Sequence, residues 1–131
     1  MDQRCCAYSF LKETSRQCDY EVASDELASL IAQAVHSVKH QPELLKLCEL
    51  VYHANGSIRG RLAIRDEDFE WLDQLYVRLM QENGPLRQFV LPAGCEGACA
   101  LHVLRSRCKA VLRIAYAIDR EEKPVPAILL D

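Results

Sequence analysis

Apolar residues recur every three or four positions through most of the chain, which is the period of a helix that buries one side. The first such run follows Ser24, whose hydroxyl can cap a helix, and the acids Asp25 and Glu26, which favour the positive end of the helix dipole. Its apolar side chains are Leu27, Leu30, Ile31, Ala34, Val35 and Val38. We therefore expect a helix that opens at Ser24, preceded by an irregular segment over residues 1–22, where no period is visible.

A second helical run begins at Pro42, a residue that the first turn of a helix tolerates because its missing N–H would have no helical partner there. Its apolar side chains are Leu44, Leu47, Cys48, Val51 and Ala54. The dipeptide Asn55-Gly56 is expected either to end this helix or to interrupt it.

The third run has clear signals at both ends. Three consecutive acids, residues 66–68, suit the positive end of a helix, and Asn83-Gly84-Pro85 stops it. The apolar stripe between them consists of Phe69, Leu72, Leu75, Tyr76, Leu79 and Met80.

The fourth helix is predicted over residues 95–119, where apolar residues keep a seven-residue repeat typical of helical bundles. They are Leu101, Leu104, Cys108, Val111, Ala115 and Ile118. Residues 120–131 are expected to form a tail, because two prolines exclude a regular helix. No alternating strand pattern competes. The sequence predicts one all-α domain over residues 1–131, an up-and-down bundle of four to five helices.

Composition narrows the class of protein. A length of 131 residues is enough for one core, and a net charge of −3 argues against a nucleic-acid-binding face. No apolar run is long enough to span a membrane, and the N-terminus carries no signal-peptide pattern. The seven cysteines are an odd number scattered through helical pattern, unlike a disulfide framework. We expect a cytoplasmic protein with reduced thiols and neither nucleic acid nor membrane among its partners.

Residues 86–113 carry the most specific motif of the chain. The loop Phe89-Val90-Leu91-Pro92-Ala93-Gly94 leads into a helix that carries Leu101-His102, Arg105, Cys108, Lys109 and Arg113. This order and spacing resemble the signature of the PduO-type cobalamin adenosyltransferases, in which a Phe-x-Leu-Pro-Gly-Gly loop precedes a long basic helix. The segment around Asp25 also resembles the Asp-Glu-Leu-x-Ser core of the family's first helix.

The resemblance implies a trimer of helical bundles that binds MgATP and a corrinoid at subunit interfaces. It implies that Asp25 pairs with Arg105 across the subunit boundary and that Phe89 packs against the corrin. Lys109 and Arg113 lie on the family's anion-binding face. Asp25, Phe89, Arg105, Lys109 and Arg113 are therefore the candidate ligand-binding residues.

The sequence matches the family less well at the residues that bind ATP. The family begins with a glycine-rich segment that holds the triphosphate, because glycine lets several backbone N–H groups converge on phosphate. Residues 1–20 contain no glycine. The family's Arg-Arg-x-Glu-Arg run becomes residues 109–113, where Lys109 lacks the bidentate fork of arginine and Leu112 replaces a carboxylate. ATP as a cofactor is therefore in doubt.

A separate cluster, Cys95, Cys99 and His102, falls on one face of the fourth helix at intervals of four and three residues. Thiolate and imidazole ligands at this spacing can hold Zn²⁺ or another soft metal, with Cys5 or Cys6 as a further ligand. The alternative is a family histidine beside cysteines that serve as small core residues.

The sequence thus favours a degenerate adenosyltransferase-like protein that binds a corrinoid at a subunit interface without ordinary ATP-dependent adenosylation. One alternative is an active enzyme whose nucleotide site is rearranged around Lys109 and Arg113. Another is a metal or thiol protein built on the same bundle. The expected partners are copies of this chain in a trimer, a full-length adenosyltransferase or a cobalamin-dependent enzyme.

Overall fold

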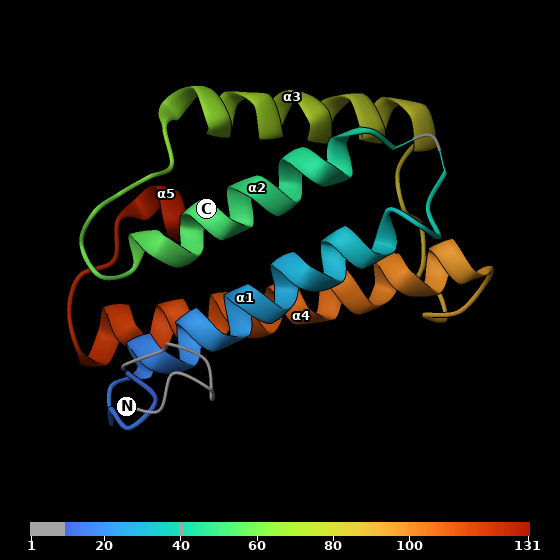
Figure 1. Ribbon diagram of the computed structural model, residues 1–131. Helices are drawn as coiled ribbons and strands as arrows, with labels where there is room; N and C mark the ends of the chain where they lie inside the picture. The colour runs from blue at the N-terminus through green and yellow to red at the C-terminus, as the bar shows by residue number, and fades with distance from the viewer. Residues whose placement is uncertain (1–9, 40) are drawn as a thin grey trace.

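The computed structural model describes residues 10–39 and 41–131, and their secondary structure is entirely helical (Figure 1). The helices are α1 (Arg16–Ala34), α2 (Glu43–Ser57), α3 (Asp66–Asn83), α4 (Glu96–Glu121) and α5 (Ala127–Leu130). The predicted all-α bundle is confirmed. No helix in this described part of the chain is long and apolar enough to cross a bilayer.

The first helix begins eight residues before the predicted start, so residues 16–22 are not irregular. Its N-cap is Ser15, whose Oγ accepts a hydrogen bond from the Gln17 N–H at 3.1 Å. Ser24, the predicted cap, is fully buried and donates from Oγ to the carbonyl oxygen of Tyr20 at 2.7 Å. A serine can bond back to the preceding turn in this way, so the hydroxyl that suggested a helix start lies inside the helix.

Asn55 and Gly56 do not interrupt α2, which continues to Ser57. The Asn55 side chain instead points at α1, where its Nδ2 donates to the Glu21 carbonyl at 2.6 Å and to Ser24 Oγ at 2.9 Å. This polar contact fixes the register between the two helices because both hydrogen bonds join the Asn55 side chain to one turn of α1.

The predicted limits of α3 are confirmed, and those of α4 are within two residues. The carboxylate of Asp68 accepts hydrogen bonds from the backbone and side chain of Arg65, which fixes the start of α3. The Arg65 guanidinium is the main cause of a lowered pKa for Asp68. Gly84 ends α3 with a φ of 70°, a value that glycine adopts without strain. In α4, Cys95 is the N-cap and the helix continues to Glu121.

The tail is not wholly irregular. After Pro126, residues 127–130 form the single turn of α5. Asp119 accepts a hydrogen bond from the Val125 N–H at 2.8 Å, which folds the tail back onto α4. Proline is compatible with this short helix because it lies just before the first turn.

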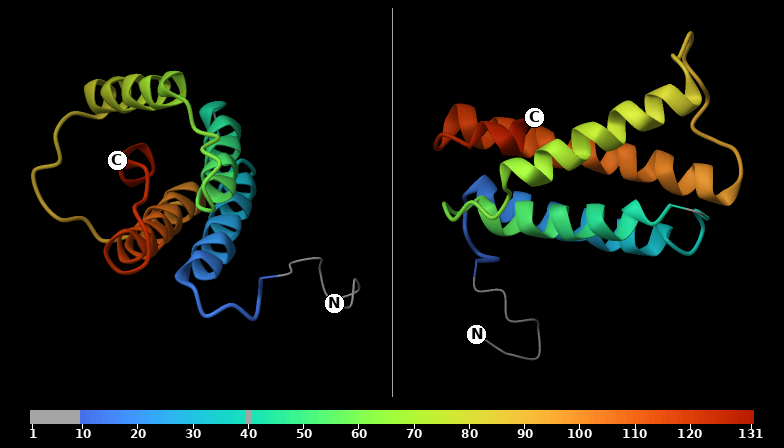
Figure 2. Two further views of the ribbon diagram at one scale, coloured as in Figure 1. Left: turned by 90° about the vertical axis from the view of Figure 1, so that its left-hand side faces the viewer. Right: turned by 90° about the horizontal axis from the view of Figure 1, so that it is seen from above.

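The core lies where α1 packs against both α2 and α4. Its buried apolar residues are Tyr20, Leu27, Ile31, Ala34, Leu44, Ile58, Val111, Ala115, Ile118 and Val125. The third helix is outside this core and lies along α2, so α3 and α4 stand on opposite sides of the molecule with α5 between them (Figure 2).

One close approach in this core depends on a missing side chain. A Cβ on Gly97 would lie 2.7 Å from the Ser37 carbonyl oxygen, where α4 begins beside the end of α1. We predict that Gly97→Ala destabilises the fold by about 1–3 kcal/mol through overpacking. Gly56, on the exposed side of α2, has no atom within 4 Å of such a Cβ, so Gly56→Ala should stabilise by about 0.5–1 kcal/mol. Urea unfolding of both variants tests this, and equal effects would contradict it.

Glu122, just after α4, anchors the start of α1. Its carboxylate accepts hydrogen bonds of 2.7 Å from the Arg16 N–H and from Ser15 Oγ. These bonds, led by the one from the Arg16 backbone, lower the pKa of Glu122. The stabilisation is therefore complete above the carboxyl pKa of the unfolded chain and is lost as pH falls through the lower pKa of the folded chain.

We predict that the difference in unfolding free energy between the native chain and Glu122→Gln shrinks as pH falls below about 4.3, the ordinary pKa of glutamate. Urea unfolding between pH 7 and pH 3 measures it. In a Ser15→Ala background the pH-dependent part should be smaller, because one of the two hydrogen bonds is already absent. A difference that does not change with pH would contradict the anchoring role.

Candidate functional site

The loop between α3 and α4, residues 84–95, presents large apolar side chains to solvent. Gly84 begins it, and Gly94 ends it with a φ of 142° that favours glycine. Phe89 is 106% exposed, Leu86 84%, Leu91 80% and Val90 54%. Phe89 therefore packs against nothing in the described part of the chain. An exposed apolar cluster of this kind is typical of a binding surface.

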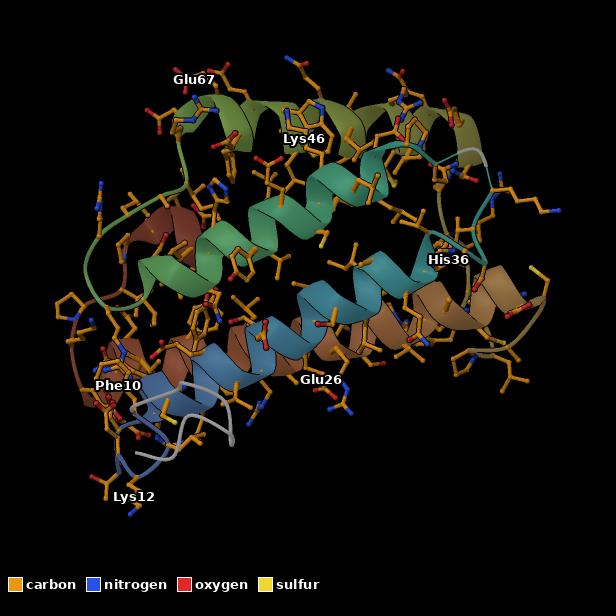
Figure 3. The ribbon with its side chains drawn as sticks, in the orientation of Figure 1. Phe10, Lys12, Glu26, His36, Lys46 and Glu67 are labelled. Atoms are coloured by element: carbon orange, nitrogen blue, oxygen red, sulfur yellow. The ribbon has the colours of Figure 1, made fainter. Side chains whose placement is uncertain are left out.

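The predicted basic residues lie on one outer side of α4, as their spacing of four residues requires. Arg105, Lys109 and Arg113 are all exposed. Among residues 10–39 and 41–131, none of the three forms an ion pair. The arginine that does bind α1 from α4 is Arg107, whose Nη2 lies 3.5 Å from Oε1 of Glu26 (Figure 3).

Asp25 is exposed on α1, next to the Glu26 that pairs with Arg107. In the described residues it forms no ion pair with Arg105 or with any other cation. The structure thus leaves both charges of the predicted intersubunit pair exposed and without a partner in one chain. Their pairing across a subunit boundary stays a prediction.

The predicted thiol and imidazole cluster lies at the start of α4. Cys95 and Cys99 are exposed, His102 is half-buried, and the Cys99 thiol donates to the Gly94 carbonyl at 3.6 Å. No group of three His, Cys, Asp or Glu side chains within the described ranges is arranged to hold a metal ion. The further ligands suggested from sequence, Cys5 and Cys6, lie outside those ranges. The metal site stays a prediction without geometric support.

Cys108 lies one turn from Arg105 and near the buried phenol of Tyr20. Although part of the residue is exposed, burial raises the pKa of the Cys108 thiol. Burial, and to a lesser degree Cys108, raises the pKa of Tyr20 to about 12, and the Tyr20 hydroxyl donates to the Ala54 carbonyl at 3.3 Å. Both groups therefore stay protonated at neutral pH and are not available there as general bases.

Sequence reasoning overlooked two features of this region. The first is that Leu86 and Val90 belong to the exposed apolar cluster of the loop. Their position in a predicted loop, between two helices and part of neither, could have indicated that they are exposed. The second feature is that much of the apolar stripe predicted for α3 is not buried. Four of its side chains, Phe69, Leu72, Tyr76 and Met80, are 39–61% exposed.

The described chain is thus an all-helical bundle in which a loop with an exposed phenylalanine precedes a long helix with exposed cations. The sequence model described as Cobalamin adenosyltransferase matches residues 8–130. The corrinoid adenosyltransferase of Citrobacter freundii is 33% identical over 119 residues, which are 91% of this chain and 66% of the relative. The chain belongs to the cobalamin adenosyltransferase family and spans about two-thirds of the length of this curated relative.

Exposure and thiol acidity give a prediction for the cysteines. At pH 7.5 a maleimide should modify Cys95 and Cys99 first, because they are exposed, and Cys108 more slowly, because its raised pKa leaves less thiolate. Cys18 is buried and should react only on unfolding. Peptide mapping by mass spectrometry after timed labelling measures the order. Equal rates for Cys108 and Cys95 would refute it.

Proposed function

We propose that this protein binds a corrinoid at an interface between subunits of a homo-oligomer, a trimer by analogy with its family, without ordinary ATP-dependent adenosylation. Membership of the cobalamin adenosyltransferase family supports the corrinoid as ligand, as does the similarity to the corrinoid adenosyltransferase of Citrobacter freundii. The many thiols and the acidic net charge fit a cytoplasmic protein that does not bind nucleic acid.

The complete exposure of Phe89 is the observation that carries the proposal. A phenyl ring held in a loop bounded by α3 and α4, with Leu86 and Leu91 also exposed, gains free energy when a large flat ring system covers it. The corrin ring is such a surface. Phe89 would pack on its face while the neighbouring leucines exclude water.

Charge placement supports the subunit interface. Asp25 on α1 and Arg105 on α4 are exposed and opposite in charge, and each lacks an ion-pair partner among the described residues of its own chain. Pairing them between chains would give an interface with heterologous contacts, which closes into a ring when the rotation permits. Such an interface would place the Phe89 loop of one subunit near its neighbour.

The residues expected to bind the ATP phosphates are largely missing, which argues against ordinary adenosylation. No glycine precedes Gly56 in this sequence, so residues 1–55 offer no glycine-rich phosphate loop. Lys109 binds phosphate as a point charge, and Leu112, half-buried in α4, brings no carboxylate. Arg105 and Arg113 remain as cations for an anionic group of the ligand. Storage, delivery or sensing of a corrinoid fits this set better than catalysis.

An anaerobic visible-absorption titration with reduced cobalamin, first without and then with MgATP, tests the proposal. We expect the corrin bands to shift without ATP. Phe89→Ala should weaken binding by about 10-fold or more, because burying a phenylalanine contributes about 1.5–3 kcal/mol. The stability of the variant should not change, since the ring is fully exposed. Val22→Ala, at an exposed position of α1, is the matched control and should bind as the native chain does.

Each other outcome rejects a defined part of the proposal. Native affinity in Phe89→Ala would remove Phe89 from the site. Formation of adenosylcobalamin on adding MgATP would show an active enzyme, and Lys109 and Arg113 would then be the candidate phosphate-binding residues. No spectral change would reject corrinoid binding, and metal analysis of untagged protein would then test the cluster of Cys95, Cys99 and His102.

A further inference from the structure

The third helix stands apart from the core that holds the rest of the bundle together. Close backbone approaches join α1 to α2, α1 to α4 and α4 to α5, whereas α3 approaches other helices only at isolated points. Figure 1 shows α3 as a separate layer along α2. Among the described residues, neither the apolar core nor the side chains packed against it include any from α3. The core therefore does not require α3 to stay in place.

The side of α3 that faces α2 buries little apolar surface. Leu75 is the only apolar side chain of α3 that is buried, and the other buried residue, Asp68, is bonded to Arg65 at the start of the same helix. Four further apolar side chains of α3 are already 39–61% exposed: Phe69, Leu72, Tyr76 and Met80. Moving α3 off α2 therefore brings little more than Leu75 and the half-buried Trp71 into water. The loss of stabilisation is small, because it scales with the apolar area uncovered.

Two electrostatic contacts hold α3 on α2. The Arg78 guanidinium pairs with the carboxylate of Glu43, and the Lys46 ammonium lies 4.3 Å from the centroid of the Trp71 ring (Figure 3). Both α2 residues lie near the start of that helix. Partly exposed ion pairs and cation–π contacts are each weak, because solvent competes for the charges. We call these two contacts the latch.

One atom of the latch is poorly satisfied while α3 lies on α2. Oε1 of Glu43 accepts a hydrogen bond from Arg78, whereas Oε2 is buried and has no hydrogen-bond partner in the described part of the chain. A buried carboxylate oxygen without a partner raises the free energy of the state that buries it. Water can reach this oxygen once α3 has moved away, so the closed arrangement carries a cost that an open one does not.

The two ends of α3 are attached differently. Before its start, the Ala63 N–H donates to Ser57 Oγ at 2.9 Å, which ties the turn ahead of α3 to the end of α2. At its other end, Gly84 leads into the loop over residues 84–95, which does not hold α3 tightly. Three side chains of this loop are at least 80% exposed: Leu86, Phe89 and Leu91. The turn at Ala63 is therefore a pivot, and the residues next to Gly84 can move furthest.

We propose that α3 is a hinged arm, which swings away from α2 about the Ser57–Ala63 turn while α1, α2 and α4 stay folded. The latch sets the ratio of closed to open molecules. Arg78 lies about 18 Å along the helix from its start at Asp66. A contact at that distance from the pivot opposes the swing more effectively than one near Asp66. This equilibrium goes beyond the proposed function, because it requires no ligand.

Thiol labelling under native conditions measures the opening. Leu75→Cys places a thiol on the buried side of α3, and Cys18 of α1 is the internal control, since the two positions are 8% and 7% exposed. Mass spectrometry gives the maleimide rate at each site, divided by the rate of the same site in urea-unfolded protein. We expect position 75 to react at least about 10-fold faster than Cys18. Its rate should also rise less steeply with urea, because opening exposes far less surface than unfolding.

Hydrogen exchange of the native chain gives a second readout, which is free of the packing that Leu75→Cys itself removes. An isolated helix of 18 residues is only marginally stable in water, so the amides of α3 exchange once it has left α2. We expect these amides to exchange at least about 10-fold faster than those in the middle of α1. Their exchange should again depend less on urea than that of α1.

Matched substitutions in the Leu75→Cys chain test the latch. Arg78→Gln removes the ion pair between α3 and α2, and should raise the labelling rate at position 75 by about threefold. Arg107→Gln removes the similarly exposed ion pair between α4 and α1. It should leave position 75 unchanged, because that pair is present whether the arm is closed or open. Gly97→Ala, which overpacks the core, should raise the rate at Cys18 but not at position 75.

Three results would overturn the proposal. Equal normalised rates and equal urea dependence at position 75 and Cys18 would show that α3 leaves α2 only when the whole chain unfolds. An effect of Gly97→Ala at position 75 as large as its effect at Cys18 would show the same. A rate at position 75 that Arg78→Gln does not change would reject the latch. None of these results bears on the corrinoid titration, which depends on Phe89.

Discussion

The packing of α1 between α2 and α4 is the constraint on which the other parts of the molecule depend. Leu27, Ile31 and Ala34 are buried there, and the buried Ser24 accepts a hydrogen bond from the Asn55 side chain of α2. Burial of apolar side chains supplies the driving force, and the paired polar contact sets the register. With three helices fixed in this way, α3 need only lie along α2. Much of its apolar stripe and of the loop to α4 is therefore left exposed.

The sequence predicted helix ends correctly where the signal is local and missed them where tertiary contacts decide. Asp66 and Gly84 mark α3 because a charge and a positive φ act locally, and both limits were predicted. The first turns of α1 were missed because Cys18 and Ser24 are buried there without looking like a core stripe. The helical turn after Pro126 was missed because tertiary contacts, including the Val125–Asp119 hydrogen bond, hold it.

For the candidate site, the sequence predicted where residues lie along the helices better than it predicted what surrounds them. The spacing of Arg105, Lys109 and Arg113 correctly placed them on one side of α4. An apolar stripe with a period of 3.6 residues forms on a helix that faces the core and equally on a helix that faces a partner. The period therefore does not tell whether the stripe is buried within its own chain. For this reason the sequence could not distinguish the exposed Tyr76 from the buried Leu75, one position away on the same helix.

The contact between Ser15 and Glu122 has a consequence for how the chain is made. The two residues are 107 positions apart, and yet one caps the helix that begins the core. On the ribosome, α1 and α2 can pair early because they are neighbours in sequence. The amino end of α1 cannot be fastened until the last residues of α4 have emerged. Closing so large a loop makes this step late, and the nascent chain exposes its first helix to chaperones until then.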